Sequence, residues 1–186
     1  MKTPVLETER LTLRPISLSD APAVQKYFNN WNIIRNLATA VPWPYPDDGA
    51  ETFIRDVCIP ETEKGNFMVW VIIPKSGPDE AIGIVHYRKI PINDGQRGFW
   101  LAEPFQGRGY MTEAVTAVQD CLFFTLGIDR FTVANALSNT KSHRIKEKTG
   151  AKFLRYIEIP HHSGESVSEL WEVTRESWEK IRDRSV

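Results

Sequence analysis

Two neighbouring stretches decide the fold: Gly98–Val115, with the sequence GFWLAEPFQGRGYMTEAV, and Leu126–Leu154, with LGIDRFTVANALSNTKSHRIKEKTGAKFL. In the first, a strand pattern ends in a turn with two glycines, after which apolar residues recur at helical spacing. Gly127 is a typical C-terminal stop for that helix. The second stretch predicts a strand from Arg130 and a polar helix over Asn139–Thr149. Together they predict strand, glycine turn, helix, strand, helix.

The flanking sequence extends this pattern into an α+β fold. The other expected strands are Leu11–Arg14, Phe67–Pro74, Ala81–Ile90, Arg97–Glu103, Lys152–Ile159 and Ser168–Trp178. The other expected helices start at Ser19 or Asp20 and run to Phe28, cover Trp31–Ala38, and run from Asp47 to Cys58, ending at Pro60. The proline-rich Val41–Gly49 is expected to be a loop within one domain that spans residues 1–186. The order predicts a mixed sheet with helices on both faces.

The composition is that of a globular protein near electrical neutrality. The 186 residues carry 23 Lys and Arg against 24 Asp and Glu, a formal net charge of -1. Such a chain has no general attraction to phosphate, so we expect no direct binding of nucleic acid. No signal peptide or membrane span is expected, because no apolar window is long enough. Cys58 and Cys121 have no metal-ligand or redox spacing, which indicates reduced thiols, no metal site and a cytoplasmic protein.

The glycine turn from Gln106 to Met111 suits an anion. Successive backbone N–H groups between a strand and a helix converge at the positive end of the helix dipole, where a pyrophosphate would fit. The same glycines could equally serve only the tight geometry of the turn. The turn lacks the Gly-Lys-Ser/Thr ending of a nucleotidase phosphate loop.

Several separated motifs, in order, resemble the GNAT superfamily of N-acetyltransferases, in the branch of the ribosomal-protein alanine and serine N-acetyltransferases. They are LETERLTLRPISLSDAPAV, PWPYPDDGAETFI, the two stretches quoted above and the closing RESW, so the resemblance covers nearly the whole chain. It implies a V-split mixed sheet of six or seven strands, with acetyl-CoA between the fourth and fifth. It also implies direct transfer of the acetyl group to an amine, and it places RESW in the last strand.

The resemblance also assigns residues to the acetyl-CoA site. It implies a pyrophosphate loop made of Gly107, Arg108, Gly109, Tyr110, Met111 and Thr112. It implies that the backbone of Trp100, Leu101 and Ala102 pairs with the pantetheine arm and polarises the thioester carbonyl. Asn139 matches a pantetheine contact and Ser142 a position near the sulfur. Asn139 and Ser142 could instead be ordinary helix-cap residues.

Three positions depart from the family's pattern. Met111 stands where the family usually has Ala or Gly, so its side chain must fit beside the phosphate turn or point into the core. Lys146 occupies the position of a Tyr that protonates the departing thiolate in many members. Ala134 stands where some members have a basic Glu. Ser142 is therefore the expected proton donor, directly or through water.

An amine attacks a thioester only in its neutral form. An α-amine, with a pKa of about 8, is partly neutral at pH 7, whereas a lysine amine, at about 10.4, is almost wholly charged. A weak base then suffices. Glu158 is the candidate, with His86, His161 and His162 as alternatives, although each could be an ordinary surface or loop residue.

Further groups suggest where the ends of the two substrates lie. Lys141, Arg144 and Lys148 share one helix face and could attract the adenosine phosphate of CoA, or form only a solvated basic face. The resemblance places the aromatic residues on the acceptor side, where they could clamp a peptide or simply pack the proline-rich loop. They are Trp31, Trp43 and Tyr45.

The sequence thus leads to an acetyl-CoA-dependent N-acetyltransferase acting on a protein N-terminus such as that of a ribosomal protein. The rival acceptor is a small amine, an amino acid or an aminoglycoside-like compound. A different class of protein, a CoA-binding module without catalysis, is suggested by Met111, Lys146 and Ala134. The oligomeric state is left open, a homodimer included.

Overall fold

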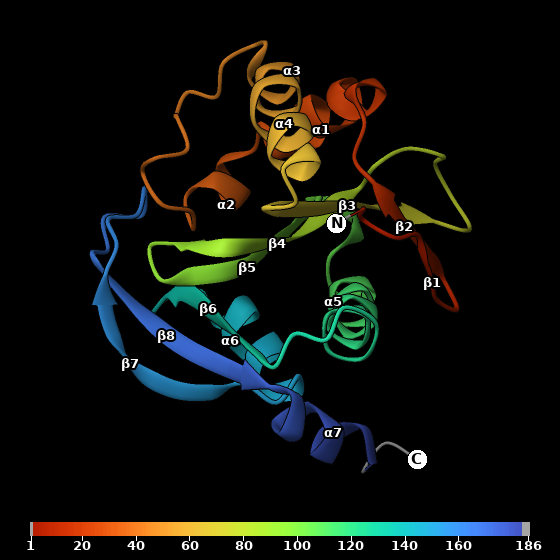
Figure 1. The fold of residues 1–186 in the computed structure, drawn as a ribbon. Helices are drawn as coiled ribbons and strands as arrows, with labels where there is room; N and C mark the ends of the chain where they lie inside the picture. Colours follow the sequence, from red (N-terminus) through yellow and green to blue (C-terminus); the bar gives the residue numbers. More distant parts are fainter. Residues whose placement is uncertain (1, 184–186) are drawn as a thin grey trace.

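Two antiparallel sheets frame the molecule in the computed structural model, which describes residues 2–183 (Figure 1). The first has the order β1-β2-β3-β4-β5, with β1 Leu6–Glu7, β2 Leu11–Pro15, β3 Phe67–Pro74, β4 Gly83–Ile92 and β5 Gly95–Leu101. The second has the order β6-β8-β7, with β6 Arg130–Ala136, β7 Lys152–Glu158 and β8 Val167–Thr174. The helices are α1 Ala21–Phe28, α2 Trp31–Ile34, α3 Gly49–Phe53, α4 Ile59–Glu63, α5 Tyr110–Asp120, α6 Thr140–Lys148 and α7 Arg175–Asp183.

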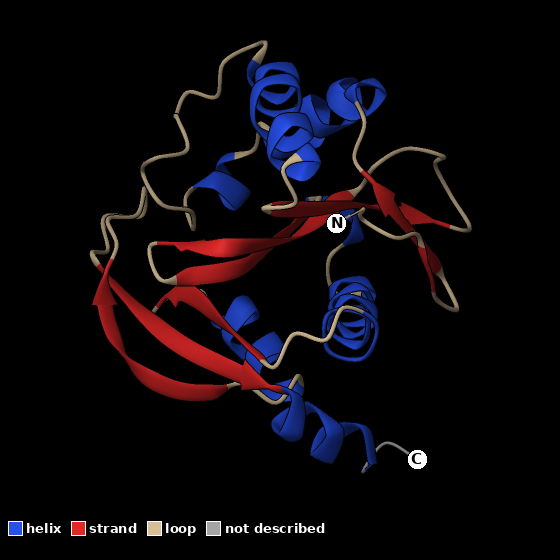
Figure 2. Cartoon of the chain, viewed as in Figure 1, coloured by secondary structure: helices blue, strands red, loops and turns tan. Residues whose placement is uncertain are grey.

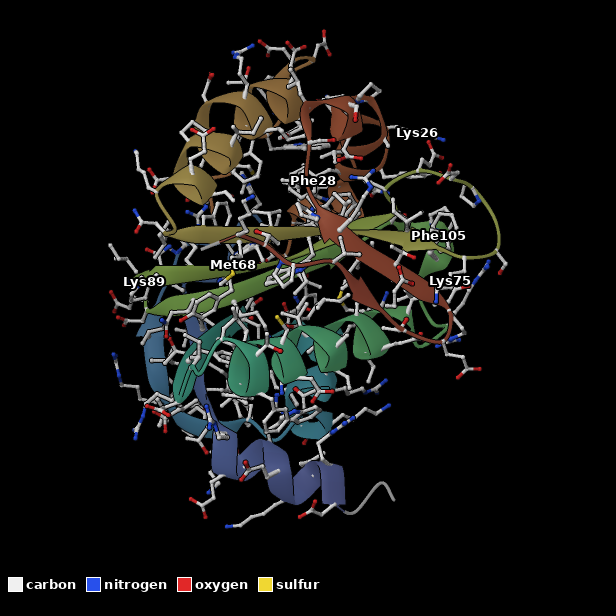
Figure 3. All side chains as sticks on the ribbon, turned by 45° about the vertical axis from the view of Figure 1, so that its right-hand side comes forward. Lys26, Phe28, Met68, Lys75, Lys89 and Phe105 are labelled. Carbon is white, nitrogen blue, oxygen red and sulfur yellow. The ribbon has the colours of Figure 1, made fainter. Side chains whose placement is uncertain are left out.

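Helices cover both faces of the first sheet, as β3 shows. Its side chains alternate between the two faces, because successive residues of a strand point in opposite directions. Met68 and Trp70 lie in a core with α5, whereas Val69 and Val71 lie in a second core with α1 and α3. Figure 3 shows Phe28 among the upper helices and Met68 on the opposite side of the sheet. Burial on both faces explains why β3 is almost wholly apolar.

The two sheets diverge between β5 and β6, which share no strand ladder among the described residues (Figure 2). Side chains join them at the end near the β4–β5 turn. The Thr132 N–H donates to Gln96 Oε1 at 3.1 Å, and the Thr132 hydroxyl donates to the Asp94 carbonyl. The strands are therefore held together at one end and separate toward Leu101 and Ala136, which gives the expected V.

Two loops cross from one sheet to the other beside this opening. The Thr39 N–H donates to the Pro160 carbonyl at 2.9 Å, and the Ser163 N–H donates to the Arg35 carbonyl at 2.9 Å. Ala38 and His161 form an isolated antiparallel bridge. We refer to residues 35–41 and 160–163 as the crossing loops.

The α+β fold with its split sheet is confirmed, but residues 2–183 form eight strands, not six or seven. The additional strand is the short Leu6–Glu7, which pairs with β2. The helix expected over Trp31–Ala38 ends at Ile34. No helix within residues 2–183 is long and apolar enough to cross a bilayer.

The expectation that Pro60 ends a helix is wrong. The chain stays helical to Glu63, because the turn over Ile54–Cys58 is a π-helix and Pro60 lies in the first turn of α4. A proline clashes with the carbonyl four residues before it in a regular α-helix. The wider π turn changes that spacing and accommodates the ring.

The expectation that RESW belongs to the last strand is also wrong. Strand β8 ends at Thr174, and Arg175–Asp183 forms α7. Thr174 and Ser177 cap this helix reciprocally, each side-chain oxygen accepting the other's backbone N–H at 3.1 Å. Trp178 is buried, and its indole N–H donates to Asp120 Oδ1 at 2.8 Å. The buried Trp178 thus holds α7 against α5, in a segment that was expected to continue the last strand.

Candidate active site

The glycine turn lies at the N-terminus of α5, and its two glycines adopt the left-handed conformation. Gly107 has a φ of 77° and Gly109, the N-cap of α5, a φ of 80°. Residues with a Cβ rarely adopt such angles. The chain therefore turns sharply into α5, whose first amides have no partner within the helix.

A long-range contact fixes this turn. The Arg10 guanidinium donates to the Arg108 carbonyl at 2.9 Å, forms an ion pair with Glu113 at 2.6 Å and lies 4.9 Å from the centre of the Tyr110 ring. Hydrogen bonds from Thr8 and Arg10 hold the pKa of Glu113 below its ordinary value, despite the opposing effect of burial. Arg10 and Glu113 thus position the turn without facing the cavity described next.

A cavity of about 610 Å³ extends from the turn along β5 to α6. Its basic residues are Lys141, Arg144 and Lys148, and the described residues that line it include no Asp or Glu. It is lined by Gly107, Gly109, Tyr110, Met111 and Thr112 of the turn, and by Trp100 and Leu101 of β5. An elongated ligand with several phosphates fits this charge and shape.

The β5 residues lie at the edge of their sheet. The Leu101 carbonyl accepts from Gln106 Nε2 at 2.8 Å, and the Ala102 N–H donates to the Ile82 carbonyl at 2.8 Å. Lys141 Nζ donates to Gln106 Oε1 at 2.9 Å, which connects α6 to the turn across the cavity. Because β5 has no strand on its β6 side, its edge faces the opening between the two sheets.

Asn139 and Ser142 lie where this cavity meets a second one of about 490 Å³, since both residues line both cavities. Asn139 is the N-cap of α6, and its Oδ1 accepts the Ser142 backbone N–H at 3.2 Å. Asn139 therefore caps α6, and both Asn139 and Ser142 also lie at the junction of the two cavities. Ser142 is 8% exposed.

The second cavity is apolar and basic. Aromatic and aliphatic side chains form much of its wall, among them Phe28, Phe53, Phe67 and Trp100. Its titratable residues are His86, Arg88, Arg97, Lys146 and His161, and no Asp or Glu is found among the described residues that line it. Ala134 lines it as well, so no acid comes from that position.

Two of these basic side chains are almost fully buried. Arg97 is 4% exposed, and its Nη1 donates to Gln119 Oε1 at 2.5 Å. Lys146 is 1% exposed, and its Nζ has no hydrogen-bond partner among the described residues. Burial lowers the pKa of Arg97 to about 9; burial and the charge of Arg97 lower the pKa of Lys146 to about 6.

The structure does not bring Glu158 into this junction. It lies on the exposed edge strand β7 and lines a separate surface depression with Asn93 and Arg155. Of the alternative bases, His86 and His161 line the second cavity, and His162 instead binds the Val41 carbonyl through Nε2 at 2.6 Å. Burial, with the nearby Arg88 and Arg97, lowers the pKa of His86 to about 3.

The three aromatic residues expected on the acceptor side do not lie together. Neither cavity is lined by Trp31, Trp43 or Tyr45. Tyr45 is buried against Phe28, with ring centres 5.0 Å apart, and burial raises its pKa to about 12. Trp31 and Trp43 pack against each other at 5.1 Å, are each 40% exposed, and Trp31 lies 6.2 Å from the His162 ring. They lie beside the crossing loops.

Met111 points into the core shared by α5 and the first sheet, while part of it lines the first cavity. Its size is therefore accommodated by packing. Within residues 2–183, no group of three or more His, Cys, Asp and Glu side chains is placed to hold a metal ion.

Sequence reasoning missed the roles of Arg10, which lies within the motif LETERLTLRPISLSDAPAV, and of Gln96, which lies just before the strand expected from Arg97. Arg10 contacts a residue 98 positions away, and Gln96 one 36 positions away. No local pattern reports such pairs. Arg97 also gave no signal, because it stands between Gln96 and Gly98 on β5 and has the charged side chain typical of a solvated strand position, although it is buried.

Two adjoining cavities, one suited to a polyanionic ligand and the other apolar and basic, fit an enzyme that transfers a group between two substrates. Residues 10–152 match the family described as "Acetyltransferase (GNAT) domain". The chain belongs to the GNAT acetyltransferase family, as its motifs indicated, and its relatives are N-acetyltransferases that use acetyl-CoA.

Individual proteins agree with this membership. The "Uncharacterized N-acetyltransferase p20" of Bacillus licheniformis is 27% identical over 142 residues, covering 75% of this chain and 78% of the relative. The crystal structure of a ribosomal-protein-S5-alanine acetyltransferase from Vibrio fischeri superposes with a TM-score of 0.79 at 20% identity, covering 94% of this chain and 98% of that one. Mycobacterium smegmatis RimJ, in complex with CoA-disulfide, superposes with a TM-score of 0.80 at 16% identity, covering 100% and 98%. At these identities the two structures establish the fold.

Replacing Ser142 with alanine should lower kcat roughly 10²-fold while the Kd for acetyl-CoA barely changes, because proton delivery acts in the transition state. The stability should be nearly unaffected, since Asn139 caps α6 through the Ser142 backbone N–H, which the variant retains. Steady-state kinetics and a thermal melt on one preparation test this, with the exposed Ser166→Ala as control. Unchanged turnover would restrict Ser142 to a packing role.

Proposed function

We propose that the protein transfers the acetyl group of acetyl-CoA directly to the α-amine of a protein N-terminus, such as that of a ribosomal protein. The observation that carries the proposal is the junction of two cavities at Asn139 and Ser142. The first cavity fits the phosphates and pantetheine of acetyl-CoA, whose thioester supplies the activated acetyl group. The second then receives the amine.

On this proposal, the chain's own groups divide the work. The amides from Gly107 to Thr112 bind the pyrophosphate at the start of α5. The edge of β5 at Trp100 and Leu101 binds the pantetheine and offers donors to the oxygen that becomes negative during attack, an effect usually worth a few kcal/mol. Asn139 orients the arm. Lys141, Arg144 and Lys148 attract the adenosine phosphate.

Direct transfer is supported by the state of the two cysteines. Both are buried and free, and neither lines the two cavities. Burial raises the pKa of Cys58 to about 12 and that of Cys121 to about 11, so both remain protonated thiols. A thiol of this kind is a poor nucleophile.

The charge of the second cavity favours an α-amine over a polycationic drug. A compound with several ammonium groups needs carboxylates around it, and none lines this cavity. The buried Arg97, which stays charged at pH 7, instead disfavours a positive charge on the acceptor, which lowers the pKa of the acceptor amine and raises its neutral fraction. That effect suffices for an α-amine, whose pKa in water is about 8.

Thiol release from acetyl-CoA with a panel of acceptors tests the proposal. Peptides with a free α-amine should be acetylated in preference to the same peptides with a blocked N-terminus and a free lysine, because an α-amine has a roughly 10²-fold larger neutral fraction at pH 7. A polyamine of the aminoglycoside type should be a poor substrate. Faster acetylation of the polyamine would refute the proposed acceptor, and no acetylation of any amine would favour a CoA-binding module.

A further inference from the structure

The buried Lys146 amine has no role in the steps described so far. It lies four residues after Ser142 on α6, and residues at this spacing are neighbours on one helix face. Both residues line the second cavity. Burying an amine without a hydrogen-bond partner costs free energy of folding. A buried, unpartnered amine beside the reaction site therefore points to a role in the reaction.

Acetyl transfer requires one proton to move. The acceptor nitrogen loses a proton when its bond to the acetyl carbon forms, and the CoA sulfur needs one when the C–S bond breaks. No carboxylate lines the cavity where this exchange occurs. The exchange must therefore use one of the basic side chains or water.

The other basic side chains of the cavity are poorly suited. Arg88 and Arg97 are guanidinium groups that stay protonated at neutral pH, even though burial lowers the pKa of Arg97 to about 9, so neither can accept a proton. His86 is so weak a base, with a pKa lowered to about 3 by burial and by both arginines, that it cannot retain a proton near neutral pH. His161 is engaged through Nε2 with Ser168 Oγ at 2.7 Å, its Nδ1 has no partner among the described residues, and it lies in the crossing loops opposite Ala38, not beside Ser142 on α6. Lys146 remains.

We propose that Lys146 accepts the proton released by the acceptor amine and returns it to the sulfur of CoA. Because Lys146 Nζ has no hydrogen bond to Ser142 among the described residues, water together with the Ser142 hydroxyl passes the proton between Lys146 and the reacting atoms. Lys146 thus does not contact the reacting atoms itself. It holds the proton during transfer and acts through Ser142, which makes it a positioning residue. The step balances: one N–H bond is broken, one S–H bond is formed, and the amine of Lys146 ends as it began. The inference rests on acetyl transfer at this site as proposed above.

The surroundings of Lys146 suit both halves of this exchange. Burial and the positive charge of Arg97 on β5 lower its pKa to about 6, and Glu169 on β8 opposes them. Glu169 is itself paired with His143 of α6 at 2.9 Å. Lys146 is therefore neutral at pH 7 and can accept a proton. A developing thiolate nearby then favours its return.

The test measures kcat and KM from pH 5 to pH 9 for the wild type, Lys146→Met, Lys146→Arg and Ser142→Ala, with the acceptor that the panel identifies. Lys146→Met should lower kcat roughly 10²-fold with an unchanged KM for acetyl-CoA. The part of the wild-type decline in rate that titrates near pH 6 should disappear, and only the titration of the acceptor amine should remain. Lys146→Arg introduces a fixed positive charge that can neither accept nor release a proton, so it should be as slow as the methionine variant. The exposed Lys152→Met is the matched control.

The possible results separate the two proposals. A Lys146→Met variant with the turnover and pH profile of the wild type would overturn the role of Lys146 and leave the α-amine acceptor intact. Rescue by Lys146→Arg would also overturn it, since a fixed charge would then suffice. Acetylation of a different primary amine by the wild type would overturn the proposed acceptor alone. Thermal melts with and without acetyl-CoA show that each variant is folded and binds its cosubstrate.

Discussion

Replacing Gly109 with valine should abolish the thermal stabilisation that acetyl-CoA gives the protein. A ligand that binds only the folded state contributes about 2.7 kcal/mol at a concentration of 100 times its Kd. Gly109 has a φ of 80°, and a Cβ there would lie 3.3 Å from a terminal nitrogen of Arg10. A β-branched residue cannot adopt this angle without strain, so the amides at the start of α5 should lose their alignment.

The matched control is Gly127→Val. Gly127 has a similar φ of 70°, has no atom within 4 Å of its added Cβ and lies outside both cavities. Both variants should therefore be less stable than the wild type. Only the Gly109 variant should fail to gain from acetyl-CoA in a thermal melt. A folded Gly109→Val protein with the full gain would disprove the assignment of the pyrophosphate to this turn.

Replacing Lys146 with methionine should raise the free energy of unfolding at pH 7 by several kcal/mol, even as it impairs turnover. The folded protein lowers the pKa of Lys146 from 10.5 to about 6. Between these values the unfolded chain binds a proton that the folded chain releases, which destabilises the folded state by about 1.4 kcal/mol per pH unit below 10.5. Methionine has a similar length and needs no proton.

The pH dependence separates this effect from ordinary repacking. The stability of the wild type should rise toward that of Lys146→Met as the pH increases from 7 to 9, because the unfolded lysine is closer to losing its own proton at the higher pH. Urea unfolding at both pH values measures the difference in free energy of unfolding between the variant and the wild type. The titration of Arg97 largely cancels in this difference, because both proteins contain Arg97. The exposed Lys152→Met should show no such change. A difference between variant and wild type that is equal at pH 7 and 9 would mean that Lys146 titrates normally.

The sequence predicted the elements that depend on local patterns. The glycine turn before α5 was foreseen because left-handed backbone and a free helix N-terminus are properties of a few adjacent residues. Asn139 at the start of α6 was foreseen for the same reason. RESW misled because the resemblance placed it in the last strand, whereas the helix there is held by the contact of Trp178 with Asp120, 58 residues away.

The acceptor side was predicted less well, since it is built from contacts between distant segments. Glu158 was chosen by its place on a strand, but the side of the sheet edge that faces the cavity depends on how the second sheet is oriented. Trp31 and Trp43 were chosen by residue type, and in the structure they pack on each other. The burial that makes Lys146 unusual comes from the sheets around α6, which helical spacing does not reveal.

The division of the protein into two sheets also means that changes in acceptor specificity and changes in acetyl-CoA binding affect largely different residues. The cavity assigned to acetyl-CoA is lined mainly by β5, α5 and α6 and shares Leu37 with the second cavity, whereas Ala38 and Val41 of the crossing loops line only the second. Loops accept insertions and substitutions more readily than strands and helices. Such changes can alter which acceptor fits while the groups that activate the acetyl donor stay in place. New acceptor specificities are thus accessible to this fold without a new catalytic apparatus.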